Sequence, residues 1–139
     1  MTLRPSLSPA GFTLIETMIA VAIVAVLAAV ALPYYLDQVS HGRRSDLQTQ
    51  LMEDANYLQR YYAANATYAT AASLPVSQSP RAGAPNYNIT IATQSATGFQ
   101  LQATRAGAMA NDRCGDFTYD NLGIKGLSNN TDTIPNCWR

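Results

Sequence analysis

The 139-residue sequence predicts an α+β fold in which one long N-terminal α-helix packs on a small antiparallel β-sheet. Up to about residue 65, a continuous apolar run is followed by apolar residues at helical spacing. The remainder holds three or four short segments in which apolar and polar residues alternate, as in half-buried strands. The formal net charge is zero, so overall charge predicts neither a nucleic-acid nor an anionic-membrane partner.

The apolar run near the N-terminus is open to more than one interpretation. In a secretory signal peptide, Arg4 would supply the basic region and residues 18–28 the apolar core, followed by a small-residue cleavage site. As a plain transmembrane anchor, the run 18–32 is shorter than the roughly 20 residues needed, and extending it to Phe12 takes in Glu16. A carboxylate at the centre of a bilayer costs about 2.5–3.5 kcal/mol, so Glu16 is either tolerated near the membrane surface or retained for a partner.

Residues 11–16, GFTLIE, give a third interpretation because they resemble the processing site of type IV pilins. In that family a dedicated prepilin peptidase cuts after the glycine and methylates the new N-terminal amine. The resemblance therefore implies a leader, residues 1–11, with cleavage between Gly11 and Phe12 and N-methylation of Phe12. Pro33, followed by two tyrosines, also stands where pilins carry a proline and aromatic residues.

The same resemblance implies a role for Glu16. A buried carboxylate is tolerated when a cation lies within hydrogen-bonding range, and cleavage would create one at the amine of Phe12. Glu16 would pair with this amine on a neighbouring subunit and set the register of assembly, whereas in the alternative it snorkels at the membrane surface. Residues 12–36 would form the transmembrane segment and filament core, and residues 37–139 the soluble domain.

The helix is predicted to become amphipathic beyond Pro33. One continuous helix over residues 12–65 is expected, with weak points at Pro33 and at Gly42 and a possible capping box between Ser45 and Gln48. Pro33 either allows a fibre to stretch locally or only bends the helix as it leaves the membrane. The apolar positions share one helical face: Leu47, Leu51, Ala55, Leu58 and Tyr62.

Polar residues just beyond the apolar run have two interpretations. Arg43 and Arg44 either contact lipid head groups or an acidic neighbour, or are two solvated arginines on a helix face. His41 has no acid, base or nucleophile near it in the sequence and is expected on the surface.

The predicted strands alternate apolar and polar residues and are separated by turn-forming segments. Residues 65–85, rich in Ala, Ser and Pro, are expected to form a connecting loop with little regular structure, and residues 94–98 a hairpin loop. The strands cover residues 87–93, 99–104 and 116–120, with a further short segment at 124–127.

Two cysteines predict one disulfide. Cys114 and Cys137 follow an export-like N-terminal segment, which favours a bond formed outside the cytoplasm. The bond would close a ring of roughly 24 residues and stabilise the fold by about 3.5 kcal/mol in the chain-entropy model. A zinc site would need four ligands, and His41 is distant in sequence. Trp138 is expected to pack over the disulfide.

The C-terminal residues extend the resemblance to the PilE-type minor pilins. Residues 57–62 (YLQRYY), 114–115, 120–126 (DNLGIKG) and 137–139 (CWR) look like that subgroup. The resemblance implies a type IV pilin fold with a disulfide-bounded C-terminal loop. It also implies a minor pilus subunit of the bacterial inner membrane and extracellular fibre, which enters the fibre or primes its assembly in twitching motility and adhesion. Its partners would be other pilins, prepilin peptidase and the inner-membrane assembly machinery.

Alternative functions are a major pilin, a secretion-system pseudopilin or a DNA-binding competence pilin. DNA binding would need a basic strip. The basic residues beyond Arg44, opposed by seven acidic ones, are dispersed: Arg60, Arg81, Arg105, Arg113, Lys125 and Arg139. An enzyme is not expected, because the sequence shows no nucleophile–base pair, metal-ligand cluster or glycine-rich phosphate loop, and neither a cofactor nor a metal is predicted. The spacing of Asp112, Asp116 and Asp120 does not match a calcium loop.

Overall fold

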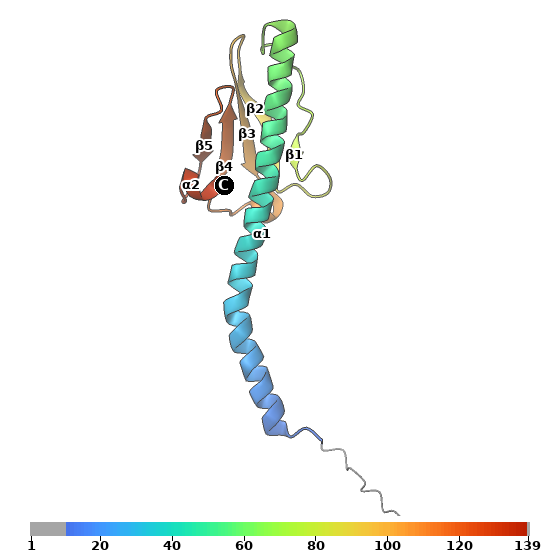
Figure 1. Ribbon diagram of the computed structural model, residues 1–139, viewed down its shortest axis with the longest axis vertical. Helices are drawn as coiled ribbons and strands as arrows, with labels where there is room; N and C mark the ends of the chain where they lie inside the picture. Colours follow the sequence, from blue (N-terminus) through green and yellow to red (C-terminus); the bar gives the residue numbers. More distant parts are fainter. Residues whose placement is uncertain (1–10, 139) are drawn as a thin grey trace, which may run out of the picture. The chain divides into compact units, whose positions relative to one another are not determined.

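The computed structural model describes residues 11–138 (Figure 1). Apart from Gly11, the expected leader lies outside the described residues, and so does Arg139. The chain divides into two compact units between Asp37 and Gln38, and each is described by itself. Unit 1 ends at Asp37, and unit 2 comprises residues 38–139.

Helix α1 (Leu14–Asn65) begins in unit 1 and ends in unit 2. The predicted weak points at Pro33 and Gly42 do not interrupt the helical assignment. A proline costs roughly 3 kcal/mol and a glycine roughly 1 kcal/mol in a helix interior. The helix continues through both residues because helix formation is cooperative and the turns on either side are helical. The predicted capping box at Ser45 is wrong, because this residue lies inside α1 and its carbonyl accepts a hydrogen bond from Thr49 Oγ1 at 3.0 Å.

Unit 2 contains a five-stranded antiparallel sheet with the strands in sequence order. The strands are β1 (Gln78–Ser79), β2 (Tyr87–Gln94), β3 (Phe99–Arg105), β4 (Asp116–Asp120) and β5 (Lys125–Ser128). The prediction of an antiparallel sheet is confirmed, and β2 to β5 match the predicted segments to within one residue. β1 was missed, since two residues inside a segment rich in Ala, Ser and Pro carry no alternating pattern.

The core of unit 2 lies between the sheet and the second half of α1, which run side by side in Figure 1. The predicted helix face is buried at every position except Tyr62, which is 37% exposed and stacks on Tyr68 at 4.5 Å between ring centroids. The strands contribute six buried apolar side chains: Tyr87, Ile89, Phe99, Leu101, Ala103 and Phe117.

Two short helical segments complete unit 2: the 3₁₀ turn η1 (Gly107–Met109) and α2 (Ile134–Cys137). Neither was predicted, because segments of this length show no helical periodicity. The chain enters β4 through Gly115, whose φ is +70° and where an added Cβ would lie 2.2 Å from the carbonyl oxygen of Ser128. Glycine is therefore required for the approach of β4 to the end of β5.

Candidate functional site

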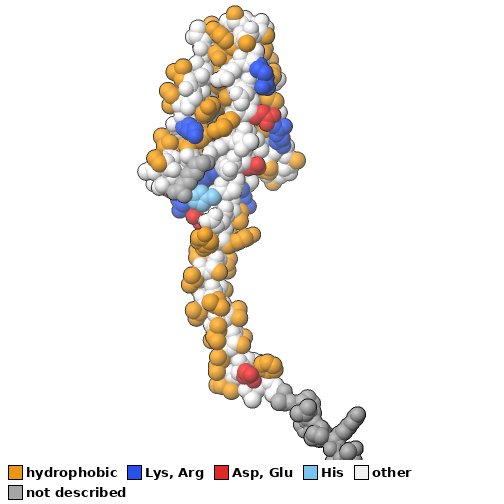
Figure 2. Space-filling view, viewed as in Figure 1, with side chains coloured by type: hydrophobic (Ala, Val, Ile, Leu, Met, Phe, Trp, Pro, Cys, Tyr) orange, Lys and Arg blue, Asp and Glu red, His pale blue; other side chains and the backbone are white. Residues whose placement is uncertain are grey.

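The first candidate site is the apolar part of unit 1, residues 12–36. Its large hydrophobic side chains are exposed, and Figure 2 shows them along this stretch of the helix. By length and composition, α1 includes a segment apolar enough to cross a membrane. An exposed apolar surface of this extent marks a membrane- or protein-binding segment.

Glu16 is the only charged residue between Phe12 and Leu36. Its backbone N–H donates to Thr13 Oγ1 at 3.3 Å, so Thr13 caps the N-terminus of α1. Thr13 and Glu16 have the spacing of a capping box, and an acidic residue in the first turn is favoured by the helix dipole. This cap was missed in the sequence although the S/T-x-x-E signature is present. Glu16 is therefore placed in the first turn of the helix and is the fifth residue after the expected cleavage point.

The other site residues of this segment are arranged along the chain. Gly11 and Phe12 precede α1, and Pro33 lies inside it. The structure describes a single copy of the chain, in which these residues follow one another without converging on a pocket shared with Glu16.

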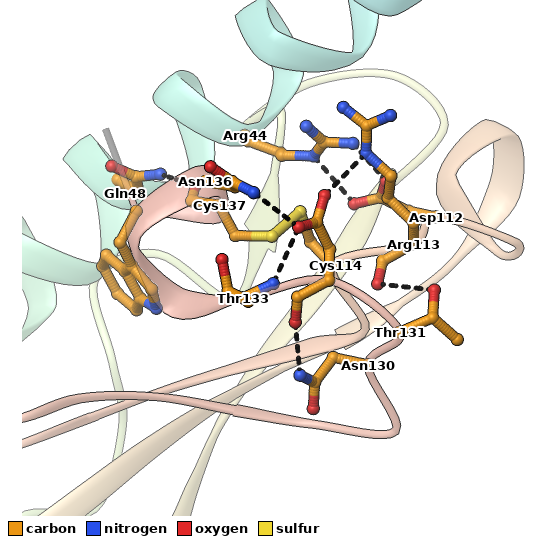
Figure 3. The surroundings of a disulfide bond; sticks show 12 residues. Arg44, Gln48, Asp112, Arg113, Cys114, Asn130, Thr131, Thr133, Asn136 and Cys137 are labelled. Atoms are coloured by element: carbon orange, nitrogen blue, oxygen red, sulfur yellow. Dashed lines mark hydrogen bonds and ion pairs between the residues drawn. A yellow bond between two sulfur atoms is a disulfide. The ribbon is translucent and has the colours of Figure 1, made fainter.

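The second candidate site is the disulfide region of unit 2 (Figure 3). Cys114 and Cys137 form the predicted disulfide, with their Cα atoms 5.7 Å apart and both residues buried. Gln48 Nε2 on α1 donates to the carbonyl oxygen of Cys137 at 2.8 Å. The disulfide and this hydrogen bond attach the C-terminal residues both to the start of β4 and to α1.

A buried ion pair lies beside the disulfide. Arg44 on α1 binds both carboxylate oxygens of Asp112, with Nε–Oδ2 at 3.0 Å and Nη2–Oδ1 at 2.5 Å (Figure 3). The two side chains are only 3% and 4% exposed. Of the interpretations given above for Arg44, that of a solvated arginine is wrong, and that of an acidic neighbour is confirmed. Its neighbour Arg43 instead places Nη1 3.9 Å from Met109 Sδ.

Tyr87 extends this pair by donating its hydroxyl hydrogen to Asp112 Oδ2 at 2.9 Å. Burial alone would raise the pKa of Asp112, but the hydrogen bonds from Arg44 and Tyr87 and the charge of Arg44 outweigh burial and lower the pKa. The pKa of Tyr87 is raised, first by burial and then by the adjacent carboxylate. Asp112 is therefore a stably ionised structural anchor.

The three aspartates considered as calcium ligands are bound separately. Asp112 binds Arg44, whereas Asp116 Oδ1 accepts from the backbone N–H and Nε of Arg105 at 2.9 and 3.3 Å. Asp120 Oδ1 accepts the backbone N–H groups of the following turn. Among the described residues, ligand atoms do gather at Cys114, Asp132 and Cys137, but both sulfurs belong to the disulfide and so are not thiolate ligands.

Trp138 packs on the sheet beside the disulfide. Its ring lies 5.2 Å from that of Phe117 and 6.0 Å from that of Tyr119, centroid to centroid. Its Nε1–H donates to the carbonyl oxygen of Gly126 at 3.1 Å, and Lys125 Nζ lies 5.3 Å from the ring centroid. The contacts of Trp138 are therefore with residues of β4 and β5.

Comparison with a solved structure identifies the fold. The minor pilin PilV of Neisseria meningitidis matches with a TM-score of 0.54 over 69% of this chain and 93% of that one, at 21% sequence identity. At that identity the likeness shows the fold, which is the type IV pilin fold: a long N-terminal helix, an antiparallel sheet and a C-terminal disulfide.

Sequence comparison identifies the family. A model described as "Prokaryotic N-terminal methylation motif" matches residues 8–32, and one described as "Type IV minor pilin ComP, DNA uptake sequence receptor" matches residues 33–118. The latter covers more than half of the 139 residues, and the chain belongs to this family of type IV minor pilins.

Curated relatives match a shorter stretch. The fimbrial protein EcpC of Eikenella corrodens is 56% identical over 36 residues, which are 26% of this chain and 24% of that protein. The type IV major alpha-pilin of Moraxella bovis is 49% identical over 41 residues, 30% of this chain and 26% of that protein. The aligned part of the chain thus spans about a quarter of the length of the curated relatives it matches.

Proposed function

We propose that this minor pilin is a building block of a type IV pilus fibre, held in the inner membrane by residues 12–36 until assembly. The observation that carries the proposal is the exposed apolar surface of unit 1, which needs lipid or other apolar helices to cover it. Prepilin peptidase would cut between Gly11 and Phe12 and methylate the amine of Phe12. Other pilin subunits would then replace lipid around the segment, with the inner-membrane machinery driving the transfer.

Glu16 would direct this assembly by its charge. It is the one charged side chain in an apolar segment, so inside a fibre it needs a cationic partner. The new amine of Phe12 on a neighbouring subunit supplies such a cation and fixes the axial register of the two helices. Pro33 would supply the position at which α1 yields when the fibre is stretched, because its ring leaves one backbone carbonyl without a helical donor.

In this proposal the chain acts through packing and pairing, without a catalytic step. It would enter the fibre or prime its assembly, and so support twitching motility and adhesion. Minor status follows from the family.

Substitutions at Glu16 can separate its charge from its capping function. Glu16→Gln keeps the capping box, which accepts Gln as well as Glu, but removes the charge. Glu16→Gln and Glu16→Ala should both be processed normally and be absent from sheared fibres, whereas Glu16→Asp should retain partial incorporation. The measurement is quantitative immunoblotting of membrane and fibre fractions. Incorporation of Glu16→Gln at the wild-type level would show that Glu16 serves only the helix cap, and would overturn the register hypothesis.

A second candidate function is DNA binding, favoured by the description of the matched family as a DNA uptake sequence receptor. The basic side chains of unit 2 do not form one strip along the sequence, and several are paired with acidic ones. Four arginines are paired with acidic side chains: Arg44 with Asp112, Arg81 with Glu53, Arg105 with Asp116 and Arg113 with Asp132. A receptor built on this chain would therefore rely on the exposed Arg60 and Lys125, on exposed pairs that open, or on hydrogen-bonding groups of its loops.

DNA binding can be tested by fluorescence anisotropy on the full chain in detergent micelles. DNA from the source organism would be compared with unrelated duplex DNA over a series of salt concentrations. A receptor should prefer its own DNA at every salt concentration, while non-specific binding should fall steeply with salt for both. Equal, salt-sensitive binding or none would reject the receptor function and leave the pilus-subunit function intact.

A further inference from the structure

Asp54 is a fully buried carboxyl on the face of α1 that packs in unit 2. Its Oδ1 accepts the backbone N–H of Val76 at 3.0 Å. Val76 lies two residues before β1, in the segment that connects α1 to the sheet. Asp54 thus holds the end of this connecting segment, residues 66–77, against the helix.

A second buried acceptor lies one helical turn away. Among the residues that the structure describes, neither Asp54 Oδ2 nor Gln50 Oε1 receives a hydrogen bond, although both atoms are buried. Residues four apart on a helix are neighbours on one face, so these two oxygens belong to the same buried region. Two buried acceptors without a donor are unfavourable, and a proton on the Asp54 carboxyl would turn one of them into a donor for the other.

The charges that reach Asp54 come from α1 and from the segment after β1. Glu53 precedes it on α1, and Arg81, which is ion-paired to Glu53, approaches from beyond β1. Burial is the largest effect on Asp54 and, with the charge of Glu53, raises its pKa to about 7. The Val76 N–H and the charge of Arg81 act in the opposite direction and are outweighed.

We propose that Asp54, Gln50 and Val76 form a proton-dependent latch, in which protonated Asp54 donates to Gln50 Oε1 while accepting the Val76 N–H. When the proton leaves to solvent, an ionised carboxylate stays buried with a single hydrogen bond. Water must then enter to solvate it, which requires the segment around Val76 to move off the helix.

The release would be local. The earlier part of the connecting segment has its own attachments: Gln94 Nε2 donates to the carbonyl oxygens of Tyr68 and Ala71, the latter at 2.9 Å. Tyr61 and Thr70 also share a hydroxyl hydrogen bond of 2.8 Å. The latch would therefore control the exposure of β1 and the residues just before it, on the free edge of the sheet.

Hydrogen exchange measured by mass spectrometry on the full chain in detergent micelles tests the latch. Protection of the Val76 amide, corrected for intrinsic exchange, should fall at least about tenfold between about pH 5.5 and pH 8.5, since one proton changes an equilibrium by up to tenfold per pH unit. In Asp54→Asn the side-chain amide donates permanently to Gln50, so protection should not change with pH. Asp46→Asn, which alters an exposed carboxylate of the same helix, should behave as the wild type.

Two outcomes would overturn the latch: equal Val76 protection at both pH values in the wild type, or a pH dependence in Asp54→Asn that equals the wild-type one. If Asp54→Asn fails to fold, Gln50→Met serves instead, because it removes the acceptor and keeps the side-chain length. Loss of that acceptor disfavours the protonated form, so the midpoint of the exchange transition should move to lower pH. An unmoved midpoint would also overturn the proposal.

Discussion

The two parts of α1 differ in whether their apolar side chains are exposed or buried. In unit 1 the apolar side chains cover the helix and stay exposed, whereas in unit 2 they form one stripe that the sheet buries. Unit 2 contains its own stabilising contacts, namely the disulfide, the Arg44–Asp112 pair and a packed core. Unit 1 contains, within the described residues, a helix and its cap. The difference separates a part with its own core and stabilising contacts from a part whose apolar surface is left exposed.

The comparison predicts that unit 2 is most sensitive where a buried charge loses its partner. Arg44→Met should leave Asp112 buried and unpaired, and should lower the free energy of unfolding by about 3–5 kcal/mol. The measurement is urea unfolding of the full chain in micelles, with Arg43→Met on the same helix as the control. The double variant with Asp112→Asn should lose less than the sum of the single changes. A loss below about 1 kcal/mol would mean that the pair is not a structural anchor.

Removal of the disulfide should have the next largest effect. The paired change Cys114→Ala and Cys137→Ala should lower the free energy of unfolding by about 3.5 kcal/mol, because the unfolded chain regains the freedom of the ring. The same variant should still insert into membranes, since unit 1 has no part in the bond. An unchanged free energy of unfolding together with impaired membrane insertion would contradict the assignment of the disulfide to the stability of unit 2 alone.

Acid should weaken unit 2 through Asp112. Its pKa is lowered in the fold, so its contribution to stability is present above the unfolded value of 3.8 and is lost as the pH falls through the folded value. Stability should therefore drop below about pH 4, and Asp112→Asn should reduce the slope. The pH dependence of stability that remains in Asp112→Asn should come from Asp116 and Asp132, whose pKa values are also lowered. An acid slope that Asp112→Asn leaves unchanged would show that Asp112 does not cause the loss of stability in acid.

The smallest effect is expected at the surface of unit 2. Arg81 and Glu53 form an ion pair whose side chains are 55% and 43% exposed. Solvent screens such a pair, so Arg81→Gln should leave the unfolding midpoint within experimental error. A loss as large as that of Arg44→Met would show that burial does not decide which ion pairs of unit 2 contribute to stability.

The sequence predicted the parts of the fold that have a period. Helical spacing located the buried face of α1 from Leu47 to Leu58, and alternation located β2, β3 and β4. The disulfide followed from there being two cysteines. Contacts between distant segments could not be predicted: Arg44 and Asp112 are 68 residues apart, and the Gln48 contact with Cys137 spans 89. Without the fold, nothing distinguished Arg44 from a solvated arginine.

The candidate sites divide in the same way. The processing motif and Glu16 lie within one short stretch of sequence and were predicted from it. The burial of Asp54 was not predicted, because it depends on how the segment before β1 covers α1. The helix cap at Thr13 was within reach of the sequence, since both members of its box lie inside the GFTLIE motif.

The central claim is that unit 1 is the assembly segment of a processed pilin. Intact mass with N-terminal fragmentation, on protein purified from its native membrane, tests this claim most directly. The expected result is a chain that begins at N-methylated Phe12 and retains Glu16. A chain that begins at Leu32 would mean that a secretory signal had been removed together with Glu16, and would contradict the claim.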